Sequence, residues 1–113
     1  MSEHEWVREF PGAVMVSDER GTIIEMNDRA ARAYEAEGGR SLIGKDLLAC
    51  HPEPARTKLA ALLAERRANV YTIEKKGVRK LIYQSPWFRD GKYAGLVELS
   101  LEIPAELPHF IRT

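Results

Sequence analysis

The sequence predicts an α+β fold, in which one five-stranded antiparallel sheet carries helices packed on one face. Segments with β-prone residues gather at the two ends of the chain, and the helical segments occupy the middle third. Two strands, a helical crossing and a three-stranded meander produce this arrangement. The same order disfavours a repeating βαβ architecture, because strands and helices do not alternate.

The N-terminal segment, residues 1–12, is expected to form a cap helix. Ser2 and Glu5 have the spacing of a capping box. Trp6 and Phe10 fall on one side of such a helix. Pro11 and the glycine after it end the segment, since both residues break helices.

A hairpin and a capped helix follow. Asp18 and Gly21 lie between two β-prone runs, at about 13–18 and 22–26, and these residue types favour a tight turn. Asn27 precedes an alanine-rich stretch that is predicted to be helical over about 28–36. Its side-chain oxygen is suited to accept a hydrogen bond from a free amide of the first turn.

The longest predicted helix covers about 53–68, after a shorter segment at 41–50. Its apolar residues keep the spacing of one helix face: Ala55, Leu59, Leu62 and Leu63. Pro54 suits the first turn, where no backbone donor is required.

Three further strands are predicted at 69–74, 78–88 and 93–103. The last one alternates cleanly between residue types. Its apolar members are expected on the buried face and its polar members on a wetter face. The apolar set is Val97, Leu99, Leu101 and Ile103, and the polar set is Glu98, Ser100 and Glu102.

Composition limits the class of protein. A length of 113 residues fits one domain. Lys+Arg and Asp+Glu both number 17, so the chain lacks the basic excess that is typical of nucleic-acid-binding proteins. Cys50 is the only cysteine, which excludes an internal disulfide and fits a reducing compartment. No apolar run approaches a membrane span. We expect a cytoplasmic protein that binds neither nucleic acid nor membrane.

These features, in this order, resemble the PAS sensor domains over residues 8–103. The resemblance implies a PAS-like domain at 13–103, with a cap helix at 1–12 and an irregular tail at 104–113. The tail contains Pro104 and Pro108, which would stop a continuing signalling helix. The matched features are the Asp18–Gly21 turn, Ile23, Asn27, Ala30-Ala31, the Leu42–Lys45 segment, the His51-Pro52 junction and the final strands.

PAS domains often hold a small molecule between their helices and the inner face of the sheet. On this sequence the resemblance, position and periodicity imply a lining of Tyr34, Leu47, Leu48, His51, Leu59, Leu63, Tyr83, Val97 and Leu99. The alternative is that these side chains fill a dry core, because hydrophobic stripes commonly serve packing.

Two cofactors of PAS domains, flavin and haem, require particular residues. Flavin-binding light-oxygen-voltage domains carry a Gly-x-Asn-Cys-Arg motif, but Cys50 comes three positions too late after Gly44, and the asparagine and arginine are missing. The sequence therefore disfavours a flavin photoadduct. His51 is a candidate haem ligand, although the usual ligand lies inside the long helix, which has no histidine here.

Aromatic residues near the two ends of the domain are candidates for a subunit contact. The set is Trp6, Phe10, Trp87 and Phe88. Pro86 cannot donate to a strand ladder, so this part of the strand is predicted to be an edge or a bulge. The alternative is that the N-terminal helix or the tail covers these aromatic side chains within the same chain.

The functional prediction is a sensory or regulatory module rather than an enzyme. It would bind a small apolar or aromatic molecule, or a partner protein, and signal through its association state, for which a homodimer is the expected form. A ligand-free dimerisation or interaction module is the alternative, and a haem-binding sensor is a further one. No phosphate-binding loop, metal-ligand spacing or nucleophile–base arrangement supports catalysis.

Overall fold

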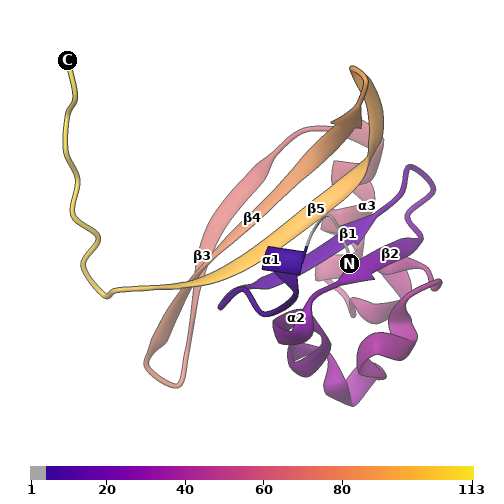
Figure 1. Ribbon diagram of the computed structural model, residues 1–113, viewed down its shortest axis with the longest axis horizontal. Helices are drawn as coiled ribbons and strands as arrows, with labels where there is room; N and C mark the ends of the chain where they lie inside the picture. The colour runs from indigo at the N-terminus through magenta and orange to yellow at the C-terminus, as the bar shows by residue number, and fades with distance from the viewer. Residues whose placement is uncertain (1–4) are drawn as a thin grey trace.

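The computed structural model describes residues 5–113, and its centre is one five-stranded antiparallel sheet (Figure 1). The strands are β1 (Ala13–Ser17), β2 (Ile23–Met26), β3 (Asn69–Lys75), β4 (Val78–Arg89) and β5 (Lys92–Ile103). Their order is β2-β1-β5-β4-β3. The pairing of β1 with β5 joins the two ends of the chain, so the predicted fold class is confirmed.

Most helices cover one face of this sheet, which we call the inner face. They are α2 (Asp28–Ala33), the short 3-10 helices η1 (Glu35–Glu37), η2 (Gly39–Leu42) and η3 (Leu47–Cys50), and α3 (Ala55–Glu65). The main core lies between them and the sheet. It contains Met15 and Leu96 from the strands and Leu59 and Leu62 from α3.

The helix α1 (Glu5–Arg8) lies over the opposite face, which we call the outer face (Figure 1). Its Val7 packs with Val14 and Val16 of β1 in a second, smaller core. The predicted cap residue Ser2 lies outside the described residues. No helix within residues 5–113 has the length and apolarity that a bilayer crossing requires.

The predicted elements exist, but the helices are shorter than expected. The helix expected at 28–36 ends at Ala33 and continues as the 3-10 helix η1. The helix expected at 53–68 covers only Ala55–Glu65, because Arg66 adopts a left-handed conformation with a φ of 55°. The Asp18 turn forms as predicted, and its carboxylate accepts hydrogen bonds from the amides of Arg20 and Thr22, both at 2.9 Å.

The two faces of β5 are reversed relative to the prediction. Val97 and Leu99 pack on the outer face with Val14 and Val16. Glu98 lies on the inner face, where it is paired with His51. The alternation is present, but the prediction that its apolar half faces the helices is wrong. α1 gives the outer face an apolar partner, while buried polar contacts accommodate Glu98 on the inner face.

β5 approaches β1 closely at Gly95. A side-chain carbon at this position would lie 1.9 Å from the carbonyl oxygen of Ser17, and the φ of Gly95 is +146°. Only glycine fits such a contact. The indole of Trp87 donates a hydrogen bond to the same Ser17 carbonyl at 2.9 Å, which fixes the end of β4 against β1.

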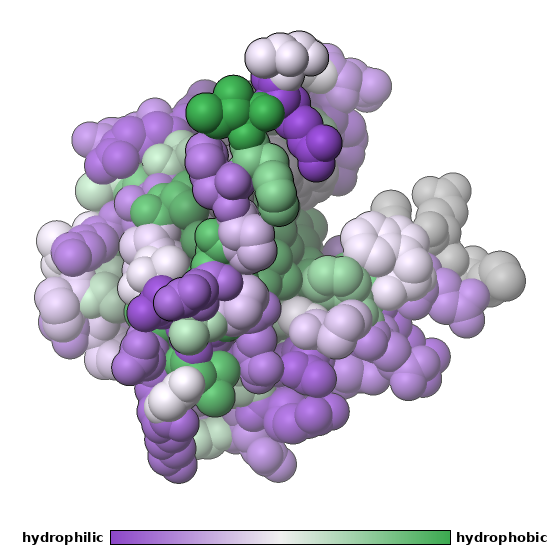
Figure 2. Space-filling view, turned by 90° about the vertical axis from the view of Figure 1, so that its left-hand side faces the viewer, coloured by the Kyte–Doolittle hydropathy of each residue, from purple (hydrophilic) through white to green (hydrophobic). Residues whose placement is uncertain are grey.

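The C-terminal residues after β5 form no helix or strand and extend away from the sheet (Figure 1). Their beginning is fixed by a hydrogen bond from the Arg79 guanidinium to the Ala105 carbonyl, at 2.7 Å. Leu107, Phe110 and Ile111 are exposed on this segment. On the side of the molecule that carries this C-terminal segment, hydrophobic and hydrophilic residues are interspersed (Figure 2).

Candidate functional site

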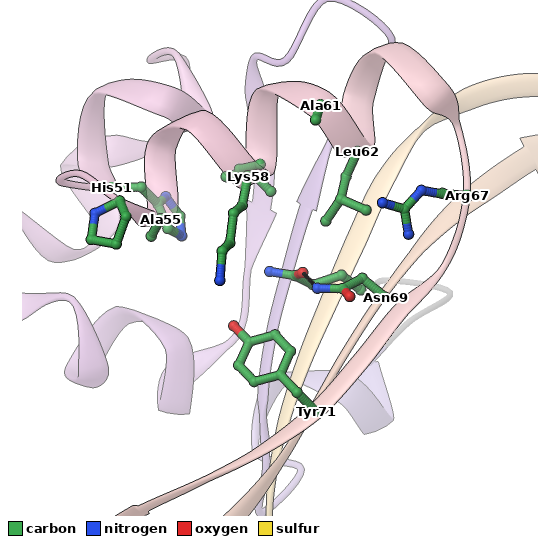
Figure 3. Close-up of a pocket in the computed structure, with 11 residues that line it drawn as sticks. His51, Ala55, Lys58, Ala61, Leu62, Arg67, Asn69 and Tyr71 are labelled. Atoms are coloured by element: carbon green, nitrogen blue, oxygen red, sulfur yellow. Dashed lines mark hydrogen bonds between the residues drawn. The ribbon is translucent and has the colours of Figure 1, made fainter.

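A cavity of about 620 Å³ opens between α3 and the strands β3 and β4 (Figure 3). We call it the inner cavity. Its volume falls in the range of roughly 300–1,000 Å³ that is typical of small-molecule sites. The lining comprises His51, Pro54, Ala55, Lys58, Leu59, Ala61, Leu62, Arg67, Asn69, Tyr71 and Gln84.

The two walls of the inner cavity differ in chemistry because they come from different elements. α3 turns Leu59 and Leu62 into the core, so its contribution is largely aliphatic. On the sheet, the pairing of Asn69 with Gln84 and of Tyr71 with Ile82 places Asn69, Tyr71 and Gln84 on the same face. The strands therefore supply the amide and phenol groups of the lining.

A chain of hydrogen bonds leads from the inner cavity across the sheet. The Asn69 amide Nδ2 donates to Gln84 Oε1 at 3.0 Å, and Gln84 Nε2 donates to Glu98 Oε1 at 2.9 Å. Gln84 is buried, so it depends on these partners. The chain connects the edge strand β3 to the central strand β5.

His51 connects the helical segment to the same carboxylate. Its Nδ1 lies 2.9 Å from the Leu47 carbonyl, which can only accept, so Nδ1 carries a proton. Its Nε2 lies 3.2 Å from the Tyr34 hydroxyl and 3.8 Å from Glu98 Oε2. Both nitrogens of the ring thus have partners within the domain.

The surroundings of His51 favour its charged form. Burial alone would lower its pKa, but hydrogen bonds with Cys50, Glu98 and Leu47 outweigh that effect and raise the pKa of His51 to about 10. Burial, with the Glu98 carboxylate second, raises the pKa of Tyr34, so its phenol stays protonated. At neutral pH an imidazolium therefore faces the Glu98 carboxylate.

The structure separates the predicted lining residues into three groups. His51 and Leu59 line the inner cavity. Tyr34, Leu47, Leu48 and Leu63 belong to the main core or pack against it, as the dry-core alternative expected. Val97 and Leu99 lie on the outer face, and Tyr83 shares that face because it pairs with Leu99. Their assignment to the inner pocket was wrong, since β5 presents its polar residues inward.

Apart from His51 and Leu59, the lining of the inner cavity was not predicted from the sequence. The polar residues missed are Lys58, Arg67, Asn69, Tyr71 and Gln84. The signal available for Tyr71 and Gln84 was their position within predicted strands. That signal became useful only with the register of β3 against β4, which brings Asn69 opposite Gln84.

The surroundings of His51 and Cys50 do not fit haem ligation or a flavin adduct. A haem iron would have to displace either Leu47 from Nδ1 or Tyr34 and Glu98 from Nε2. Cys50 is buried in the main core, and its Sγ lies 3.1 Å from the Leu47 carbonyl. Neither residue presents a free reactive atom to the inner cavity.

The outer face carries a second hollow of about 630 Å³ beside α1, which we call the outer groove. Three of the predicted contact residues line it, namely Trp6, Phe10 and Trp87. Trp87 and Phe10 are partly covered by packing within the chain, whereas Trp6 is 70% exposed. The fourth, Phe88, is exposed but lies outside the lining.

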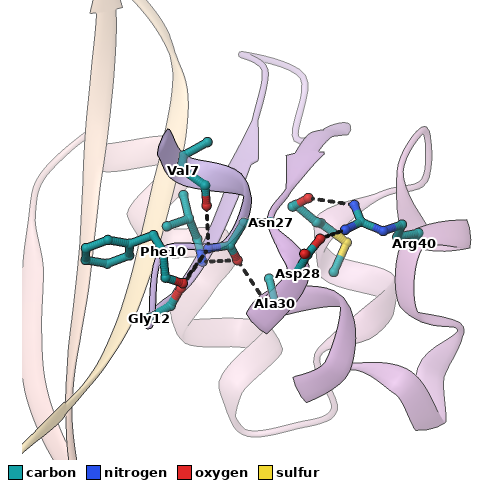
Figure 4. Close-up of polar contacts among 9 residues, drawn as sticks. Val7, Phe10, Gly12, Asn27, Asp28, Ala30 and Arg40 are labelled. Carbon is teal, nitrogen blue, oxygen red and sulfur yellow. Dashed lines mark hydrogen bonds and ion pairs between the residues drawn. The ribbon is translucent and has the colours of Figure 1, made fainter. Parts of the chain in front are cut away.

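The side chain of Asn27 attaches α1 to the rest of the domain (Figure 4). Its Oδ1 accepts hydrogen bonds from the amides of Val14 and Ala30, both at 3.0 Å. Its Nδ2 donates to the carbonyls of Val7 at 3.0 Å and Gly12 at 2.7 Å. The predicted helix cap is confirmed, and the same amide also fixes the position of α1 over the outer face.

Comparison with known proteins shows the fold. No protein-family model matches the sequence, and no curated protein matches it. The sensory box sensor histidine kinase from Vibrio cholerae is 13% identical, with a TM-score of 0.66 over 90% of this chain and 89% of that one. The PAS domain of BvgS from Bordetella pertussis is 20% identical, with a TM-score of 0.62 over 88% and 82%.

A third solved structure is the Aer2 receptor from Vibrio cholerae, described as a dual PAS-haem oxygen sensor. It is 15% identical, with a TM-score of 0.57 over 82% of this chain and 95% of that one. At these identities the likeness establishes a common architecture. The chain has the PAS fold, as the resemblance of its sequence implied.

Proposed function

We propose that this PAS-fold chain is a sensory or regulatory module that binds a small molecule in the inner cavity and signals through its association state. The observation that carries the proposal is a cavity of about 620 Å³ lined by both aliphatic and hydrogen-bonding groups. The similar folds of the histidine kinase and of BvgS, which are signalling proteins, support a sensory role. A cytoplasmic location and a homodimer are part of this proposal.

The proposed ligand has an apolar body and a polar end. Leu59 and Leu62 offer the body an aliphatic surface, and Asn69 and Gln84 offer the polar end hydrogen-bonding groups. An apolar or aromatic ligand was expected from a lining that included Val97, Leu99 and Tyr83, which lie on the other face. The inner cavity is therefore better matched to an amphipathic small molecule.

The proposed signal passes from the inner cavity to α1 through β5. A ligand that contacts Gln84 acts on the hydrogen bond between Gln84 and Glu98 of β5. β5 pairs with β1, and Asn27 joins β1 to α1. The ligand shifts the population between two positions of α1 only if it binds them with different affinities.

The outer groove is the proposed surface of association. Trp6 is exposed beside Phe10 and Trp87, and aromatic residues of this kind are enriched at protein interfaces. The same observation favours the second candidate function, a ligand-free dimerisation or interaction module. The two functions differ in one respect, because only the first requires an occupied inner cavity.

Native mass spectrometry of the freshly purified protein tests the proposal. We expect a bound species in the wild type that is lost in Ala61→Trp, whose new side chain would fill the inner cavity. Ala64→Trp is the matched control, since Ala64 is also an exposed alanine of α3 but does not line the inner cavity. Isolation of the wild type without any bound molecule would favour the interaction module.

An absorbance scan from about 350 to 450 nm separates the cofactor alternatives. Because both nitrogens of His51 have partners, we expect no haem band in the purified protein and none after incubation with haemin. Appearance of a haem band that His51→Ala abolishes would contradict this reading and support a haem sensor.

A further inference from the structure

All charged side chains that line the inner cavity within residues 5–113 are basic. They are His51, Lys58 and Arg67, and no aspartate or glutamate joins them. The whole chain has 17 basic and 17 acidic residues, so this excess is a local property of the inner cavity. A site of one sign concentrates ligands of the opposite sign.

Lys58 supplies the least neutralised of these charges. It comes from α3 immediately before the buried Leu59, and its side chain points from the helix toward the strands (Figure 3). No carboxylate among the described residues lies within ion-pair distance of its ammonium group. Arg67 is partly neutralised, since its Nε donates to Glu65 at 2.6 Å.

Tyr71 faces Lys58 from the other wall. Its hydroxyl points into the inner cavity toward the helix (Figure 3). Burial, with the Glu98 carboxylate second, raises the pKa of Tyr71, so the hydroxyl remains a hydrogen-bond donor at neutral pH. Lys58 and Tyr71 thus present an ammonium and a phenol donor to the same space.

The carboxylate that acts on Tyr71 is that of Glu98, and it already has partners. Glu98 accepts from Gln84 at 2.9 Å through Oε1, and its Oε2 faces His51 at 3.8 Å. It therefore balances His51 and does not balance Lys58. The free positive charge of the inner cavity lies at the Lys58 end, next to the aliphatic surface of Leu59 and Leu62.

We propose that the inner cavity selects small organic carboxylates, with the anionic group held by Lys58 and Tyr71 and an apolar body against Leu59 and Leu62. Hydrogen bonds between an ammonium group and a carboxylate are about twice as strong as neutral ones. A neutral molecule of the same shape makes the apolar contacts but lacks this interaction. This inference rests on the proposed function of the inner cavity and adds the chemical class of its ligand.

Benzoate and benzamide are suitable probes, because they share a shape and differ in charge. Titrations followed by ¹H–¹⁵N NMR on the full chain at neutral pH and low salt measure both affinities. We expect benzoate to bind at least about tenfold more tightly than benzamide. The amides that shift should be those of the inner cavity, such as Leu59, Asn69 and Tyr71.

Substitutions test whether Lys58 and Tyr71 cause the preference for benzoate over benzamide. Lys58→Met should reduce benzoate affinity about tenfold and leave benzamide affinity unchanged, because it keeps the length and removes the charge. Tyr71→Phe should reduce benzoate affinity by a smaller factor. Lys45→Met is the matched control, since Lys45 is exposed and does not line the inner cavity.

Three results would overturn the inference. The first is equal affinity for benzoate and benzamide, and the second is benzoate binding that Lys58→Met leaves intact. Either would show that the inner cavity does not select by charge, although it could still bind small molecules. Absence of benzoate binding to the wild type would also overturn it. The native mass spectrum of the purified protein then decides separately whether the proposed function fails as well.

Discussion

His51, which directly follows η3, and Glu98 of β5 face each other on the inner side of the sheet, with Nε2 and Oε2 3.8 Å apart. Their side chains are only 11% and 14% exposed. A buried pair of this kind is costly to break, since removal of one member leaves the other charge uncompensated. The pair also joins the helical segment to the strand that leads toward α1.

Glu98→Gln should lower the pKa of His51 from about 10 toward the ordinary value of about 6.5. Glutamine keeps the size of the side chain and removes the charge that favours the imidazolium. Titration of the His51 ring resonances by NMR measures the shift. Glu102→Gln is the control, because Glu102 lies on the same face of β5 but has no contact with His51. An unchanged pKa in Glu98→Gln would contradict the assigned role of the pair.

The stability of the domain should decrease as the pH rises from about 6.5 to about 10. The folded state raises the pKa of His51 above its unfolded value, so the stabilisation is fully present below the unfolded pKa and is lost as the pH passes the folded pKa. Urea unfolding of the wild type and of His51→Gln measures it by difference. The free-energy difference should shrink by an amount on the order of a few kcal/mol. A difference that stays constant between pH 6 and pH 10 would refute the charged state of His51.

Asn27→Ala should lower the free energy of unfolding by about 3 kcal/mol, because it removes a helix cap and leaves buried backbone groups without partners. Asn27→Asp is the sharper variant. It keeps the acceptor for Ala30 and loses the donor to Val7, so hydrogen exchange should accelerate in α1 and stay slow in α2. Equal acceleration in both helices would show that Asn27 does not specifically fix α1.

Trp6→Ala should weaken self-association without a change in the free energy of unfolding, because Trp6 is exposed beside the outer groove. Sedimentation velocity over a range of concentrations measures the association. Phe110→Ala is a matched control, since both aromatic residues are 70% exposed and Phe110 does not line the outer groove. An unchanged sedimentation profile of Trp6→Ala would argue against this surface.

Local hydrogen bonds were predictable from the sequence where a side chain binds backbone amides only a few positions away. The Asp18 turn and the Asn27 cap depend on amides a few positions along the chain, and both form as expected. The second role of Asn27, in which it binds the Val7 carbonyl, joins residues 20 positions apart and had no local signal.

The direction in which a strand faces was not predictable from alternation alone. The period of two separates Glu98 from Val97 and Leu99, but it does not say which set meets the helices. Here Glu98 can face the helices because His51 pairs with it and Gln84 donates a hydrogen bond to it. The lining of the inner cavity escaped prediction for a related reason. Lys58, Tyr71 and Gln84 come from three different elements, whose juxtaposition depends on the register of β3 against β4.

The central claim is that a small molecule occupies the inner face of the sheet. It is tested most directly by ¹H–¹⁵N NMR spectra of the protein as purified and after unfolding, exhaustive dialysis and refolding. We expect the amide resonances of Leu59, Asn69 and Tyr71 to shift when the ligand is removed. Superimposable spectra, or shifts confined to outer-face residues such as Val14 and Leu99, would contradict it.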